Sequence, residues 1–262
     1  MGKVLFVHGM GHDDDRNYWK KWAVPLRLEL AGQGLDLKEE QWEGVYYYDL
    51  MPGPGKKADQ DQVVQVQLIN LKEKVSQDLY SLRASGTRKM ETVRRIAELV
   101  VDNFGDIIAY LYFEQTHQAV NQRLYEAIAA EEEPVNLIGY SLGSIVSYCA
   151  LKQNRSAARK VAHLILLGSP LFWFRHGVAG RVGLELKPAV GRLTNIAGML
   201  DIAWPQAVPN ILHGLDQNIE FMINPFDPVR GHQEYFCNKK SLSVIASEIK
   251  KGWDIACPLN RN

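Results

Sequence analysis

V-N-L-I-G-Y-S-L-G at residues 135–143 runs from an apolar segment into the pentapeptide G-x-S-x-G, with Ser141 at its centre. The apolar segment is typical of a buried strand, and the apolar spacing after Ser141 predicts a helix. Gly139 and Gly143 let the backbone turn sharply, so we expect the Ser141 hydroxyl to project above the strand. The N-terminus of the helix directs N–H groups and a partial positive charge at this hydroxyl. An ordinary glycine-bracketed turn is the alternative.

Further apolar runs bounded by turn residues predict other buried, parallel strands. With 135–138, the expected strands are residues 4–7, 45–48, 164–167 and 219–223. Helical periodicity separates them, which favours an α/β fold with a doubly wound, mainly parallel sheet of about five or more strands and helices on both faces. The 262 residues fit a single domain, 1–262.

Two segments are expected to be additions to this sheet. The first is a helical insertion at about 52–134, which begins with the turn-rich P-G-P-G-K-K-A-D-Q-D-Q. The second is a cap-like segment at about 172–214, rich in glycine and aromatic residues. Within it, Phe172, Trp173 and Trp204 are candidates for binding substrate, and plain core packing is the alternative for each.

Composition excludes several classes of partner. Lys plus Arg and Asp plus Glu both number 30, so no overall field favours nucleic acid or an anionic membrane. The three cysteines lie far apart without metal-ligand spacing, which favours a reducing, cytoplasmic location. The longest apolar stretch, 161–174, is interrupted by polar residues and is too short for a transmembrane segment. Nucleotide-binding glycine loops are absent from the sequence, so no nucleotide cofactor is expected.

A second motif follows the first expected strand: V-H-G-M-G-H at residues 7–12. Together with G-x-S-x-G, it resembles the H-G-x-G oxyanion loop of the α/β-hydrolase superfamily. The resemblance implies that the backbone N–H groups of Met10 and Leu142 hold an acyl oxyanion, each donor contributing about 3 kcal/mol. A metal cluster of His8, His12 and Asp13 to Asp15 is a weaker alternative, because the glycines disfavour the helix that would align both histidines.

The third motif is N-P-F-D-P-V-R-G-H at residues 224–232, directly after the last expected strand. The order Ser141, Asp227, His232 is the order of nucleophile, acid and base in the resembled superfamily. That superfamily places a helix and a strand between acid and histidine, whereas four residues intervene here. Asp216 precedes the strand and should lie at the opposite edge of the sheet. Asp201, in the glycine-rich segment, is the better-placed rival.

Another serine, Ser169, also follows an expected strand. Its successor Pro170 has no N–H group, so the residue after Ser169 could not donate to an oxyanion. We therefore expect Ser169 to be a turn or pocket residue.

The resemblance implies a serine esterase or lipase-like hydrolase that cleaves a carboxylic ester through an acyl-enzyme on Ser141. It implies a small-molecule or lipid-like ester as substrate, with no cofactor and no metal. The alternatives are a non-catalytic scaffold that binds a ligand or protein partner, or an acyltransferase or thioesterase. No pattern in the sequence specifies an oligomeric state.

Overall fold

The fold is built on one parallel sheet. A computed structural model describes residues 2–9, 15–51 and 105–256, together with 62, 66, 69, 70 and 73. In this part of the chain, the strands form a six-stranded sheet in the order β2-β1-β3-β4-β5-β6. They are β1 (Val4–Val7), β2 (Trp42–Val45), β3 (Val135–Tyr140), β4 (Val161–Leu167), β5 (Arg192–Met199) and β6 (Gln217–Met222). All neighbouring strands run parallel, which confirms the expected fold class.

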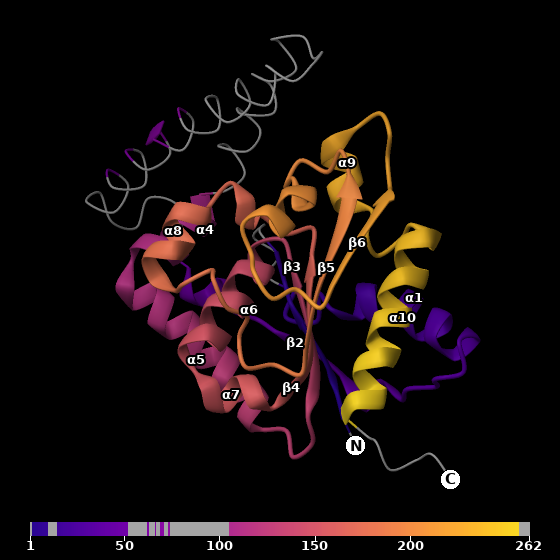
Figure 1. Cartoon of the computed structure of the whole chain (residues 1–262). Helices are drawn as coiled ribbons and strands as arrows, with labels where there is room; N and C mark the ends of the chain where they lie inside the picture. Colours follow the sequence, from indigo (N-terminus) through magenta and orange to yellow (C-terminus); the bar gives the residue numbers. More distant parts are fainter. Residues whose placement is uncertain are drawn as a thin grey trace.

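Helices cover both faces of the sheet (Figure 1). Helices α1 (Lys20–Gly32) and α10 (Lys239–Ala256) lie together on one face. The other face carries α4 (Gly105–Tyr112), α5 (Glu114–Ala129), α6 (Leu142–Gln153), α7 (Arg155–Arg159) and α8 (Arg175–Arg181). The short helix α9 (Pro228–Gln233) follows β6, and the 3₁₀ helices are η1 (Glu39–Gln41), η2 (Tyr48–Leu50), η3 (Pro170–Phe172) and η4 (Pro205–Asn210). None of the described helices is both long and apolar enough to cross a bilayer.

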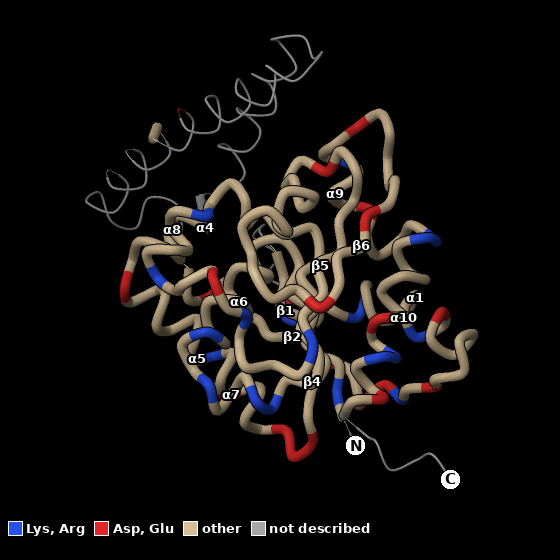
Figure 2. The backbone as a smooth tube through the Cα atoms, viewed as in Figure 1, with Lys and Arg blue, Asp and Glu red and all other residues tan. Residues whose placement is uncertain are grey.

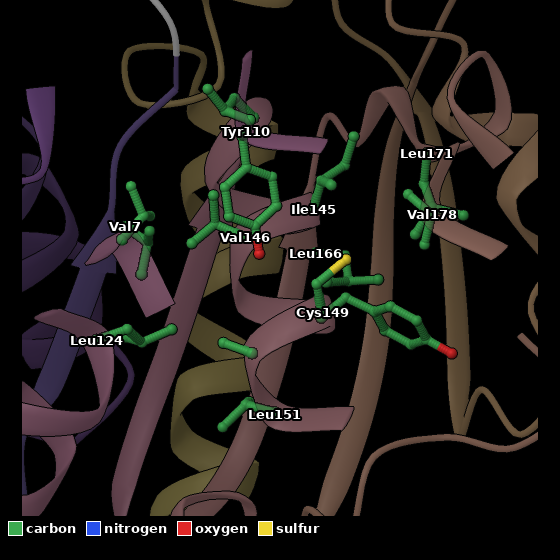
Figure 3. Packing of buried hydrophobic residues seen from close by; sticks show 14 of the residues in the cluster. Val7, Tyr110, Leu124, Ile145, Val146, Cys149, Leu151, Leu166, Leu171 and Val178 are labelled. Carbon is green, nitrogen blue, oxygen red and sulfur yellow. The ribbon is translucent and has the colours of Figure 1, made fainter. Parts of the chain in front are cut away.

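Two buried clusters hold these layers together. On one face, Ile145, Val146 and Cys149 of α6 belong to the same cluster as Val7 and Leu166 of the sheet (Figure 3). On the other face, apolar side chains of α1 and α10 pack with those of the strands. Each fully buried aliphatic side chain stabilises the fold by about 1.5–3 kcal/mol relative to an exposed one. Charged residues lie mainly on the outer helices and loops, leaving the central strands uncharged along most of their length (Figure 2).

The strand order has a switch point between β1 and β3. From β1 the chain moves outward to β2 on one side, and then crosses to β3 on the other side. The carboxyl ends of β1 and β3 therefore flank the switch point where open α/β sheets bind ligands. The register pairs Val7 with Gly139, so the segments after both strands emerge side by side.

Two expectations about the strands need correction. The strand expected at 45–48 lies at Trp42–Val45, because Tyr48 already belongs to the 3₁₀ helix η2. The segment 172–214, expected as a cap, contains the interior strand β5. Its buried polar residues Thr194 and Asn195 interrupt the apolar run by which the other strands are recognised. Of the insertion expected at 52–134, α4 and α5 are described, while the loop at 52–61 and most of 63–104 lie outside the described residues.

Candidate active site

Ser141 occupies a sharp turn between β3 and α6. Its backbone has φ 53° and ψ −123°, a conformation that residues other than glycine rarely adopt. The flanking glycines make this turn sterically feasible. A Cβ atom on Gly139 would lie 2.6 Å from the carbonyl oxygen of Gly143, and one on Gly143 would lie 2.1 Å from that of Val7. The chain thus needs glycine at both positions for α6 to start so close to β1 and β3.

The imidazole of His232 faces the Ser141 hydroxyl. His232 Nε2 lies 3.0 Å from Ser141 Oγ. The Tyr140 ring stacks on the imidazole with 5.2 Å between centroids, and its hydroxyl donates to the His232 carbonyl oxygen at 2.6 Å. The residue before the serine therefore holds the histidine through both its ring and its backbone.

The carboxylate that pairs with His232 belongs to Asp201, which follows β5. Asp201 Oδ1 lies 2.8 Å from His232 Nδ1 and also accepts from the Ala203 N–H at 2.8 Å. The Tyr235 hydroxyl donates to Oδ2 at 2.6 Å. Because a carboxylate only accepts, His232 carries its proton on Nδ1, which leaves Nε2 to accept from Ser141.

This contact corrects the expectation that Asp227 orients His232. Asp227 is exposed and is the N-cap residue of α9, where its Oδ1 accepts from the N–H groups of Val229 and Arg230 at 3.0 Å each. Aspartate followed by proline is a common start of a helix, and this local function occupies the carboxylate. Asp216 lies at the opposite edge, as expected, where it pairs with Lys187 at 2.5 Å.

Gly168, for which the sequence predicted no role, lies close to Tyr235, Asp201 and His232. It follows β4 with φ +55°, and a Cβ there would lie 2.8 Å from Tyr235 Cε2. The same Cβ would lie 3.2 Å from both Asp201 Oδ2 and His232 Cε1. The absence of a side chain at Gly168 therefore makes room for Asp201 and His232 together. A strand-end glycine followed by Ser169 was the available signal.

Ser169 lies beneath the turn and not beside the histidine. Its hydroxyl is 2.7 Å from that of Ser144, which also donates to the Ser141 carbonyl oxygen at 2.5 Å. Ser169 Oγ additionally accepts from the Leu171 N–H at 3.4 Å. These contacts make Ser169 a turn residue that supports the segment carrying Ser141.

The loop after β1 approaches Ser141 closely. A Cβ on Gly9 would lie 2.8 Å from Ser141 Cβ. His8 holds this loop: Nε2 accepts from the Tyr47 N–H at 3.3 Å, and Nδ1 donates to the Gly9 carbonyl oxygen at 2.8 Å. Tyr48 donates to that same oxygen. Both ring nitrogens of His8 are thus occupied by backbone groups.

The two expected oxyanion donors differ in what the structure describes. Leu142 is the first residue of α6, whose first four N–H groups have no partner inside the helix. Its N–H therefore belongs to the N-terminus that begins at the serine. Met10 lies outside the described residues, as do His12, Asp13 and Asp14 of the alternative metal cluster. Within the described part, the side chains form no group of three His, Cys, Asp or Glu able to hold a metal.

The expected aromatic residues support the loop that carries Asp201. Trp173 is buried, donates from Nε1 to the Ile202 carbonyl oxygen at 3.1 Å, and packs edge-on against Trp204 with 5.4 Å between centroids. Phe172 is half-buried beneath the Arg175 guanidinium, which lies 4.5 Å from its ring centroid. Trp173 and Trp204 therefore fix the backbone beside Asp201, as core packing would.

Two tyrosines, the half-buried Tyr140 and the buried Tyr235, complete the surroundings of Asp201 and His232. Burial raises the pKa of both Tyr140 and Tyr235, and the negative charge of Asp201 raises each pKa further. Both phenols therefore remain neutral and can donate hydrogen bonds throughout the ordinary pH range.

Comparisons with known proteins leave the family of this chain open. No protein-family model matches the chain, and no curated protein matches it. A solved structure from Pectobacterium atrosepticum, described as YdeN-like and provisionally as a hydrolase, is similar with a TM-score of 0.44 and 10% sequence identity. The similarity covers 96% of this chain and 92% of that one.

Proposed function

We propose that this chain is a serine hydrolase of the α/β-hydrolase type that cleaves a carboxylic ester through an acyl-enzyme on Ser141. The observation that carries the proposal is the continuous contact from Ser141 Oγ to His232 Nε2 at 3.0 Å and from His232 Nδ1 to Asp201 at 2.8 Å. A nucleophile, a base and an orienting acid in hydrogen-bond contact are the components of covalent acyl transfer. The place of Ser141 at the carboxyl end of β3, next to that of β1, supports the proposal further.

In the first half of the reaction, His232 Nε2 accepts the Ser141 proton while Oγ attacks the acyl carbonyl carbon. Asp201 stabilises the resulting imidazolium through the hydrogen bond from Nδ1. The tetrahedral intermediate then collapses, its bond to the alcohol oxygen breaks, and the imidazolium returns its proton to the departing alkoxide. An alcohol leaves, and the acyl group remains on Ser141.

In the second half, water takes the place of the alcohol. His232 removes a proton from water as the hydroxide attacks the acyl-enzyme carbonyl, and the imidazolium then protonates Ser141 Oγ as the acyl bond breaks. The carboxylic acid leaves and the enzyme returns to its starting state. No step consumes a cofactor.

Negative charge on the carbonyl oxygen needs donors in both halves. Leu142 N–H is suited to this role, since it begins α6 directly after the nucleophile and adds the positive end of the helix dipole. The second donor is expected from the loop that Gly9 begins, at Met10. We propose an ester and not an amide because an alkoxide departs more readily than an amine. We propose a small-molecule or lipid-like ester because the three sequence motifs resemble those of esterases and lipase-like hydrolases.

A fluorophosphonate probe tests the proposal directly. Purified wild-type protein should be labelled covalently and should hydrolyse p-nitrophenyl butyrate. Ser141→Ala should lose the label and at least about 10³-fold in kcat, because the covalent step disappears. Ser169→Ala is the matched control and should still label. A folded wild-type protein that neither labels nor hydrolyses would favour the non-catalytic scaffold, and alcoholysis faster than hydrolysis would favour an acyltransferase.

A further inference from the structure

We propose that Tyr235 is a positioning residue, whose buried hydroxyl bridges the end of β5 to Asp201 and holds the carboxylate in line with His232. This inference rests on the proposed function and deepens it, because it assigns to one hydroxyl the orientation of the acid.

The bridge consists of two short hydrogen bonds on one hydroxyl. The Tyr235 oxygen accepts from the Gly198 N–H at 2.7 Å and donates to Asp201 Oδ2 at 2.6 Å. Tyr235 is completely buried, so water does not compete for either bond. Its donor and acceptor functions are therefore both used, and the direction of the O–H bond is determined, because Gly198 N–H can only donate.

Tyr235 and His232 both contact the Asp201 carboxylate and lie in the same segment of the chain. They stand three residues apart, and each contacts a different oxygen: His232 contacts Oδ1 and Tyr235 contacts Oδ2. Rotation of the carboxylate about its χ2 torsion would break both bonds at once. The plane of the carboxylate is therefore set by the same turn that delivers the base.

The bridge also stabilises the backbone between Gly198 and Asp201. Between Gly198 and Asp201 the chain passes through Leu200, which has φ 68° in the left-handed region. Such a conformation persists where surrounding contacts determine it. The Tyr235 hydroxyl connects the residues on both sides of Leu200, and a Cβ on Gly198 would lie only 3.1 Å from it.

The chemistry of the buried carboxylate explains why a hydroxyl is needed. A charged carboxylate removed from water requires hydrogen-bond donors. Asp201 is almost fully buried and receives the Ala203 N–H, the His232 Nδ1–H and the Tyr235 O–H. Without the phenol hydroxyl, Oδ2 would lose its donor, and more of the negative charge would act on the imidazole.

Tyr235→Phe tests this role, with Tyr110→Phe as the matched control. Tyr110 is also fully buried, and its hydroxyl donates to Asn121 Oδ1 at 2.8 Å, a bond that involves none of Ser141, His232 and Asp201. With p-nitrophenyl butyrate, Tyr235→Phe should lower kcat about 10- to 100-fold, while Tyr110→Phe should leave it near the wild-type value. Both variants should lose similar thermal stability, since each loses one buried hydroxyl.

The pH profile separates positioning from a merely structural role. A more negative Asp201 favours the imidazolium, so the acidic limb of kcat/KM should move to higher pH by about half a unit in Tyr235→Phe. A structural defect would lower the plateau and leave the limb in place. Asp201, which is hydrogen-bonded to His232, and Tyr140, which stacks on it, are also titratable side chains in contact with the base, and both are unchanged in both variants.

A second substitution keeps the test decisive if Tyr235→Phe does not fold. A fluorinated tyrosine at position 235 retains the hydroxyl and its shape but makes it a stronger donor. It should move the acidic limb to lower pH, opposite to the expectation for phenylalanine. An unmoved limb in the folded fluorinated variant would overturn the proposal.

The proton signal of His232 Nδ1–H distinguishes this inference from the proposed function. In NMR spectra this signal should shift in Tyr235→Phe and stay in Tyr110→Phe, whether or not the protein is active. A wild-type protein without esterase activity whose signal shifts in this way would contradict the proposed function and support the positioning role. An active enzyme with an unchanged signal, kcat and pH limb in Tyr235→Phe would do the reverse.

Discussion

The turns after β5 and β6 each present an aspartate, and the two carboxylates have different partners. Asp201, after β5, is buried and accepts from His232, Tyr235 and a backbone N–H. Asp227, after β6, is exposed, and its Oδ1 accepts from the N–H groups of Val229 and Arg230 two and three residues further along the chain. Position after a parallel strand is therefore not enough to identify an acid; its local backbone must also leave the carboxylate free for a partner.

The position of each strand in the sheet explains the contrast. β5 is an interior strand that is buried along most of its length, whereas β6 is an edge strand with one buried residue. Adjacent strands lie about 4.8 Å apart, so the end of β5 is about 10 Å from that of β3 and the end of β6 about 14 Å. The imidazole of His232 spans the shorter gap and lies close to Gly168, where no side chain intervenes.

The largest expected effect comes from exchanging the two carboxylates for amides. Asp201→Asn should lower kcat by up to about 10⁴-fold, because an amide can favour the wrong histidine tautomer. Asp227→Asn should leave kcat close to the wild-type value, since asparagine also caps a helix. Ester hydrolysis by the two purified, folded variants measures this difference. A lower kcat in Asp227→Asn than in Asp201→Asn would contradict this assignment.

Much of this fold follows from local sequence patterns. Apolar runs identified β1, β3, β4 and β6, and the glycine-flanked serine identified the turn into α6. Asp201 was left as a rival because β5 was not recognised, and the reason is tertiary. The side-chain amide of its buried Asn195 donates to the Pro205 carbonyl oxygen at 3.0 Å and to Asn218 Oδ1 at 2.7 Å, contacts that no local pattern encodes. With β5 in place, Asp201 follows a strand just as Asp227 does.

A methyl group at Gly168 should disturb the packing around Asp201 and His232. Gly168→Ala places a Cβ 2.8 Å from Tyr235 at φ +55°, so we expect a loss of about 2–3 kcal/mol in unfolding free energy. Displacement of His232 or Asp201 should also lower kcat by about 10²-fold. Gly180→Ala is the control, because nothing lies within 4 Å of a Cβ there. Urea unfolding and ester hydrolysis report the two effects, and equal behaviour of both variants would contradict this account of Gly168.

The burial of His163 beside the start of β5 predicts that the unfolding free energy depends on pH. His163 contacts Thr194 of β5 at 2.8 Å, and burial lowers the pKa of His163 to about 4, although the nearby Glu248 carboxylate opposes this shift. Between about pH 6.5 and 4 the unfolded chain binds a proton that the folded chain does not. The unfolding free energy should therefore decrease as the pH falls through this window, by on the order of 2 kcal/mol.

Histidine substitutions isolate that contribution. His163→Gln should flatten the decrease in unfolding free energy between pH 7 and pH 4.5, whereas substitution of the exposed His213 should leave it unchanged. Urea denaturation at both pH values measures the difference. An identical slope in wild type and His163→Gln would show that the buried contact at β5 does not carry the effect.

The smallest expected effect concerns the cap of α9 itself. Asp227→Ala removes the oxygen that accepts from Val229 and Arg230, which should cost about 1 kcal/mol of unfolding free energy, while Asp227→Asn should cost only a few tenths. Because α9 carries His232, fraying of its first turn should also lower kcat slightly, and restoring the cap with asparagine should remove that change. Urea denaturation and kcat measurements on both variants separate the effect of losing the helix cap from the effect of losing the negative charge. If asparagine failed to rescue the activity that alanine lost, the charge of Asp227 would act on the site, and the contrast between the two turns would be one of degree.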